Sequence, residues 1–179
     1  MRFLRFTRST GRFAARTGVI AGAAALSATT LLAAPAEALP TQHRWANVAT
    51  GKCLDIRGAD VHYDALLQQF SCKVAGNQKI QTDTYLGDPT TDMRVMHSGM
   101  CLEPTGMEAG ATIVQRTCNY SQGQRWEFTW YDAGATIKNK VTGLCIDDAG
   151  MPSGSRREVR QQPCTAAAGQ LWRNLAANG

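Results

Sequence analysis

The chain has 179 residues, with 19 lysines and arginines against 14 acidic residues, and its formal charge is +5 at pH 7. Five of the arginines lie within the first 16 residues, and without residues 1–38 the chain keeps 14 basic and 13 acidic side chains. This near-neutral balance excludes the basic surface that nucleic-acid binding or attachment to an anionic membrane would need.

The first 38 residues have the pattern of a secretory signal peptide. Five arginines and no acidic residue occupy residues 1–16, small and apolar residues fill 17–34, and Ala36-Glu37-Ala38 supplies a small-x-small cleavage pattern. We expect cleavage after Ala38, so that residues 39–179 form a secreted, extracellular protein that inserts into no membrane. A retained anchor helix is the alternative, but the apolar stretch is barely long enough to span a bilayer.

The remaining 141 residues contain one pattern three times. Each copy has two cysteines 17 or 19 residues apart and a glutamine six residues after the second cysteine. A Thr-Gly or Ser-Gly pair ends two residues before the first cysteine of each copy. The cysteine pairs are Cys53 and Cys72, Cys101 and Cys118, and Cys145 and Cys164, and the glutamines are Gln78, Gln124 and Gln170. A fixed period of about 46 residues indicates a threefold internal repeat.

An even number of cysteines in an exported chain predicts disulfides. Six cysteines allow fifteen pairings, and the repeat favours one bridge within each unit: Cys53–Cys72, Cys101–Cys118 and Cys145–Cys164. A zinc site is not indicated, because the sequence has no Cys-x-x-Cys and no histidine at ligand spacing from a cysteine.

Short strands separated by turn residues recur within each unit. The candidates before the Thr/Ser-Gly pair are residues 47–49, 94–96 and 136–138, and those after the glycine-bearing loop are residues 66–70, 112–115 and 158–161. These runs favour an all-β fold with about four strands per repeat, and no helical period appears beyond the leader. We therefore expect one domain over 39–179, with repeats at about 44–82, 92–129 and 135–175 that close into a pseudo-threefold barrel.

The Gly-x-Cys-Leu-Asp start, the second cysteine and the Gln-x-Trp close resemble the ricin-B-type lectins, also called ricin-type carbohydrate-binding modules. The resemblance covers about residues 44–175 and implies the β-trefoil fold. The first repeat differs from the family, because Ile80 stands where the family has a core tryptophan. We expect Ile80 to fill the same apolar position.

The resemblance also implies one shallow sugar pocket per repeat. In the family a carboxylate two residues after the first cysteine accepts hydrogen bonds from sugar hydroxyls, an aromatic ring stacks on the sugar, and amides supply further bonds. The first repeat has every one of these residue types, at Asp55, Gln68, Phe70, Asn77 and Gln78. No metal or other cofactor is needed for such recognition.

The other two repeats keep only part of this set. Glu103 and Gln124 remain in the second repeat, where Arg116 and Gly123 replace the aromatic residue and the asparagine. Asp147 and Gln170 remain in the third repeat, with Gln162 at the aromatic position. We expect these two sites to be degraded and the three glutamines to support the fold by bonding to backbone.

Each assignment has a structural alternative. The recurring carboxylates could be turn residues that bond to backbone, and Phe70 could belong to the core. His62 and Tyr63 could line the first pocket or lie on a solvated loop. Asp60, His62 and Asp64 alternate and could form a metal trio or a His–carboxylate pair, which we consider weak because the family has a loop there.

The preferred function is a secreted lectin without catalytic activity that binds galactose-like sugars or xylan-type polysaccharide, mainly through the first repeat. An alternative is the binding subunit, or protein-interaction trefoil, of a larger secreted assembly such as a toxin or hydrolase with a separate partner chain. A trefoil-type protease inhibitor acting through an exposed loop is a third possibility.

Overall fold

The structure is a computed structural model that describes residues 41–85, 88–150 and 157–178. The expected leader at 1–38 lies outside this part of the chain. Ala38–Gly179 form one compact unit. Among the described residues, no helix is long and apolar enough to cross a membrane.

The described residues form thirteen strands joined into one sheet, with four short 3-10 helices. The first repeat holds β1 (Thr41–Asn47), β2 (Cys53–Ile56), η1 (Arg57–Ala59), β3 (Leu67–Phe70), η2 (Gly76–Gln78) and β4 (Ile80–Tyr85). The second holds β5 (Asp88–Val95), β6 (Cys101–Pro104), β7 (Ile113–Arg116), η3 (Gln122–Gln124) and β8 (Arg125–Tyr131). The third holds β9 (Gly134–Asn139), β10 (Cys145–Asp147), β11 (Arg157–Glu158), β12 (Arg160–Gln162), η4 (Ala168–Gln170) and β13 (Trp172–Ala176).

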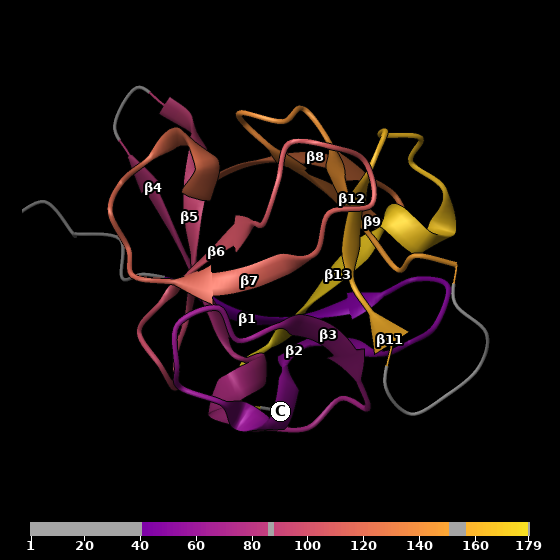
Figure 1. The fold of residues 1–179 in the computed structure, drawn as a ribbon. Helices are drawn as coiled ribbons and strands as arrows, with labels where there is room; N and C mark the ends of the chain where they lie inside the picture. The colour runs from indigo at the N-terminus through magenta and orange to yellow at the C-terminus, as the bar shows by residue number, and fades with distance from the viewer. Residues whose placement is uncertain (1–40, 86–87, 151–156, 179) are drawn as a thin grey trace, which may run out of the picture. The chain divides into compact units, whose positions relative to one another are not determined.

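Six of these strands close into a barrel. The antiparallel pairs run in a ring: β1–β4, β4–β5, β5–β8, β8–β9, β9–β13 and β13–β1. Closure leaves these strands without a free sheet edge. Six of the other seven strands form one hairpin per repeat, β2–β3, β6–β7 and β10–β12, and the seventh, β11, pairs with β3. Bridges join neighbouring hairpins to one another, so that they pack together as a group (Figure 1). The architecture is the β-trefoil, as the sequence predicted.

The disulfides follow the repeat. Cys53–Cys72, Cys101–Cys118 and Cys145–Cys164 are bonded, which confirms one bridge per unit. Each Thr/Ser-Gly turn before the first cysteine has its glycine at a positive φ of 67–71°. Only glycine adopts this conformation at little cost, which accounts for its recurrence at Gly51, Gly99 and Gly143.

The core is built from equivalent residues of the three repeats. Trp126 and Trp172 are fully buried, and each donates its indole N–H to a backbone carbonyl 3.1 Å away. Ile80, at the equivalent position of the first repeat, is buried in the same cluster, so it fills the apolar position as expected.

Two strands differ from the sequence prediction. The strand expected over 158–161 is divided at Val159 into the end of β11 and the start of β12. A strand was also expected over residues 47–49, but β1 ends at Asn47 and residues 48–50 form a turn. The Asn47 side-chain oxygen accepts bonds from the backbone N–H groups of Ala49 and Thr50, both at 3.1 Å. This local bonding competes with strand pairing and ends the strand.

Candidate functional site

The first repeat encloses a buried carboxylate held by three amide groups. Asp55 lies on β2 and is 2% exposed. Its Oδ1 accepts a hydrogen bond from Gln68 Nε2 at 2.8 Å, and its Oδ2 accepts from Asn77 Nδ2 at 2.9 Å and Gln78 Nε2 at 2.8 Å. A carboxylate has about four acceptor positions, so roughly one remains for a hydroxyl from outside.

The pairing of β2 with β3 and the helix η2 bring the three amide side chains to Asp55. On the β2–β3 hairpin Asp55 pairs with Gln68, and Cys53 pairs with Phe70. The helix η2 then brings Asn77 and Gln78 back against β2, and Asn77 Nδ2 also donates to the Ile56 carbonyl at 3.0 Å. The carboxylate is therefore fixed from strand and helix together, which preorganises it for a ligand.

A hollow of about 230 Å³ opens beside this carboxylate. We call it the first-repeat hollow, and its lining residues are Asp55, Gly58, Ala59, Gln68, Phe70, Lys73 and Asn77. The ring of Phe70 is half-buried, and the Lys73 ammonium lies 5.4 Å from its centroid. Four of the five residues expected for sugar binding thus line one hollow, while the fifth, Gln78, holds Asp55 in place.

Two cationic residues at this site were missed by the sequence analysis. Lys73 lines the hollow, and Arg57 Nε donates to Gln68 Oε1 at 3.3 Å. The disulfide at Cys72 fixes the backbone next to Lys73, but the sequence alone does not separate this lysine from other exposed lysines. Arg57 begins η1 directly after β2, and only the structure shows that its side chain turns back to Gln68.

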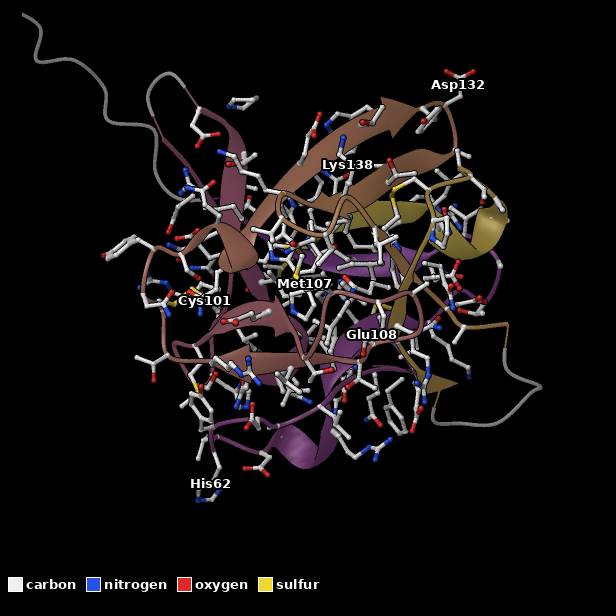
Figure 2. The ribbon with its side chains drawn as sticks, turned by 45° about the horizontal axis from the view of Figure 1, so that its top comes forward. His62, Cys101, Met107, Glu108, Asp132 and Lys138 are labelled. Atoms are coloured by element: carbon white, nitrogen blue, oxygen red, sulfur yellow. A yellow bond between two sulfur atoms is a disulfide. The ribbon has the colours of Figure 1, made fainter. Side chains whose placement is uncertain are left out.

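His62 and Tyr63 do not line the first-repeat hollow. Figure 2 shows His62 projecting away from the ribbon, and its Nδ1 lies 2.6 Å from Asp60 Oδ1. Hydrogen bonds from the backbone and ring of His62 lower the pKa of the Asp60 carboxyl. The Tyr63 ring lies 5.6 Å from the Arg116 guanidinium, so this loop reaches the second repeat instead.

The alternating acidic and histidine residues of this loop do not converge. Asp60 pairs with His62, whereas Asp64 accepts a bond from Arg116 Nε at 2.7 Å. Within residues 41–85, 88–150 and 157–178, no group of three or more side chains is arranged to hold a metal ion. The loop instead serves as a contact between repeats, because Gln115 Nε2 donates to the carbonyls of Asp60 and His62, both at 2.9 Å.

In the second repeat an arginine occupies the position beside the carboxylate. Arg116 Nη1 donates to Glu103 Oε1 at 3.1 Å, and Gln124 Nε2 donates to Glu103 Oε2 at 2.9 Å. The bond to Asp64, and then the one to Glu103, raises the pKa of the Arg116 guanidinium. Glu103 is therefore neutralised by the protein's own cation and has no aromatic ring beside it.

In the third repeat the carboxylate bonds to backbone. Asp147 Oδ1 accepts from the Ala149 N–H at 2.6 Å, as a turn residue does. Its strand partner Arg160 donates elsewhere, to the Gly110 carbonyl at 2.7 Å and to Glu158 at 2.5 Å. Asp147 thus accepts a hydrogen bond from the backbone of its own turn, whereas Asp55 accepts its hydrogen bonds from three amide side chains.

The three repeat glutamines share a role in the fold. The Oε1 atoms of Gln78, Gln124 and Gln170 accept from the backbone N–H that follows the second cysteine, at 2.7–3.0 Å. Their Nε2 atoms donate to the carbonyl that precedes it, at 2.8–3.0 Å. Each glutamine therefore fixes the end of its hairpin, and only Gln78 and Gln124 also bond to the repeat's carboxylate.

Comparisons with known proteins agree with this geometry. The family model described as the ricin-type beta-trefoil lectin domain matches residues 42–172. A search of curated proteins gives no match.

Solved structures with the same fold are similar at low sequence identity. A designed threefold-symmetric protein, ThreeFoil, has a TM-score of 0.71 at 22% identity, covering 75% of this chain and 97% of its own. The Rhizoctonia solani agglutinin has a TM-score of 0.69 at 17% identity, covering 80% and 99%. An exo-beta-1,3-galactanase from Clostridium thermocellum has a TM-score of 0.72 at 22% identity, covering 76% of this chain but 30% of its own. At these identities the likeness shows the fold alone.

Proposed function

The chain belongs to the family of ricin-type beta-trefoil lectin domains, which are carbohydrate-binding modules, and on this premise we propose that it is a secreted lectin whose working site is the first-repeat hollow. One observation carries the assignment: Asp55 is held by three amides in a hollow that Phe70 also lines. Neither of the other two carboxylates has both features.

The proposed mechanism is recognition without chemistry. The remaining acceptor position of Asp55 takes a charge-assisted hydrogen bond from a sugar hydroxyl, whose neighbour bonds to Asn77. The ring of Phe70 covers the apolar C–H face of the sugar. A small, open site of this kind binds weakly, with a Kd on the order of 0.1–1 mM.

Galactose-like sugars and xylan-type polymers are the proposed ligand classes. One structural neighbour is an exo-beta-1,3-galactanase, in which the matched region is part of a longer chain. This supports the galactose-like class but leaves the sugar to be measured.

A second role, binding a partner protein, is favoured by the other two repeats. Arg116 fills the position beside Glu103, and Asp147 bonds to backbone, so those faces are better suited to protein contacts than to sugars. Two neighbours of the same fold are cytolethal distending toxins, from Actinobacillus actinomycetemcomitans and Haemophilus ducreyi. Copurification of a separate secreted chain would support this role.

We predict that the protein recovered from culture medium binds a defined sugar class on a glycan array and that Phe70→Ala weakens this binding about tenfold. The loss follows from removing the stacking face, which contributes about 0.5–1.5 kcal/mol beyond simple burial. Phe70→Trp keeps an aromatic face and should retain binding. A folded, disulfide-bonded protein that binds no glycan would contradict the lectin assignment.

We also propose that the leader is removed between Ala38 and Leu39. Expression of the full chain in a bacterial secretion host should release a protein whose intact mass corresponds to residues 39–179. Ala38→Arg removes the small residue before the cleavage point and should leave the leader attached. Recovery of the unprocessed wild-type chain in the membrane fraction would instead support a retained anchor.

A further inference from the structure

Three aromatic rings form a cluster at one end of the barrel. Trp45 on β1 contacts Phe128 on β8 with ring centroids 4.9 Å apart, Phe128 stacks beside Trp130 at 6.4 Å with an interplanar angle of 22°, and the Trp45 and Trp130 centroids are 6.1 Å apart. The cluster reaches from the core to solvent, because Trp45 is 2% exposed and Trp130 is 57% exposed. A tryptophan so exposed contributes little to the core, so burial in the folded state does not explain its position.

A hollow of about 310 Å³ lies against this aromatic cluster. We call it the barrel-end hollow, and its lining residues are His43, Trp45, Thr82, Pro89, Thr91, Phe128, Trp130 and Asn174. They come from five strands of the barrel and from all three repeats. The volume is at the lower end of the range for small-molecule sites, about 300–1,000 Å³.

A buried polar atom in this lining lacks a partner. Among the described residues, Trp45 Nε1 is buried and makes no hydrogen bond, whereas the indole groups of Trp126 and Trp172 both donate to carbonyls. An unsatisfied buried donor costs about 1–3 kcal/mol, so it is rarely retained without a use.

The lining indicates the chemistry of the ligand. None of its eight residues is Asp, Glu, Lys or Arg, so an ionised ligand would find no counter-charge. The rings of Phe128 and Trp130 offer an apolar face, and the Asn174 amide, the Thr82 hydroxyl and the His43 ring offer donors and acceptors beside it. An apolar face rimmed by neutral polar groups matches a neutral sugar ring, which has C–H faces and a hydroxyl rim.

We propose that the barrel-end hollow is a second saccharide site, specific for a neutral sugar unit stacked on Trp130. The site does not depend on Asp55 or on the threefold repeat. The two hollows share no lining residue. In Figure 1, β8, which carries Phe128 and Trp130, lies at the top, and β2 and β3, which carry Asp55 and Phe70, lie at the bottom. Two separate sites would let one molecule bridge two glycan chains and gain avidity.

The indole N–H signals of the ¹⁵N-labelled protein provide a direct test. The probes are neutral trisaccharides of galactose, xylose, glucose and mannose, at millimolar concentration. At least one should shift the signals of Trp45 and Trp130 and leave those of buried Trp126 and Trp172 in place. The shifts should persist in Phe70→Ala, which lacks the aromatic ring of the first-repeat hollow. Loss of binding at the first-repeat hollow can therefore be told apart from loss of binding at the barrel-end hollow.

Matched variants make the result specific. Trp130→Ala should weaken the interaction reported by Trp45 at least tenfold, and Asn174→Phe, which fills the hollow and keeps Trp130, should do the same. Tyr131→Ala is the control, because Tyr131 is the next residue on β8, is 47% exposed and does not line the hollow. The proposal is overturned if no neutral probe shifts the indole N–H signals of Trp45 and Trp130. It is also overturned if the probe still shifts the Trp45 signal with unchanged affinity in Trp130→Ala, or if only a uronic-acid trisaccharide shifts the two signals in the wild-type protein.

Discussion

Asp55→Asn is expected to abolish detectable glycan binding at the first repeat and to lower the free energy of unfolding by about 2–3 kcal/mol. The substitution exchanges one carboxylate oxygen for an amide NH₂ that faces other NH₂ groups. Asp55 accepts from Gln68, Asn77 and Gln78 while 2% exposed, so at least one buried donor loses its acceptor. The sugar loses a charge-assisted bond of about 1.5–3 kcal/mol, or roughly ten- to hundredfold in affinity.

Titration calorimetry with the best array ligand and urea unfolding would measure both effects. Asn77→Ala is a gentler second variant, because it leaves Asp55 bonded to two glutamines and should weaken binding with a smaller loss of stability. The matched control is Glu103→Gln, which removes the equivalent charge in the second repeat and should leave glycan binding unchanged. If Glu103→Gln removed binding and Asp55→Asn did not, the working site would lie in the second repeat.

Reduction of the three disulfides is expected to unfold the protein or leave it marginally stable. Each bridge joins cysteines 17 or 19 residues apart and contributes about 3 kcal/mol in the chain-entropy model. Their sum is comparable with the total stability of most domains, about 5–15 kcal/mol. A urea midpoint that does not move when reductant is added would contradict this prediction.

The paired substitutions separate stability from binding. Replacing Cys53 and Cys72 by alanine should lower the free energy of unfolding by about 3 kcal/mol, as should replacing Cys101 and Cys118. Only the first pair should also weaken glycan binding, because that bridge fixes the hairpin end between Phe70 and Lys73. Binding that falls equally in both double variants would indicate a general loss of structure.

Much of the fold could be predicted because the residues that determine it recur at a fixed period along the sequence. The recurring cysteines predicted the disulfides, and the recurring turn glycines and glutamines predicted three equivalent structural units. The end of β1 was misplaced because Asn47 caps the following turn with its side chain, and a run of residue types does not reveal that bond.

The candidate sites were predictable only where they lie within one repeat. Asp55, Gln68 and Asn77 share a unit, so the resemblance of that unit to the ricin-B-type lectins predicted that they would meet. The contact of Arg116 with Asp64 joins two repeats, and the barrel-end hollow draws on all three. Such contacts depend on how the units pack, which the pattern inside a unit does not contain.

The order of strands in the barrel also governs when the protein can fold. The first strand, β1, closes the ring against the last, β13, and Arg44 bonds to the Ala176 carbonyl across 132 residues of sequence. Contacts this distant form slowly, because the chain must close a long loop before they are made. The barrel can therefore close only after the final strand has been synthesised, which fits the export that we propose for this chain.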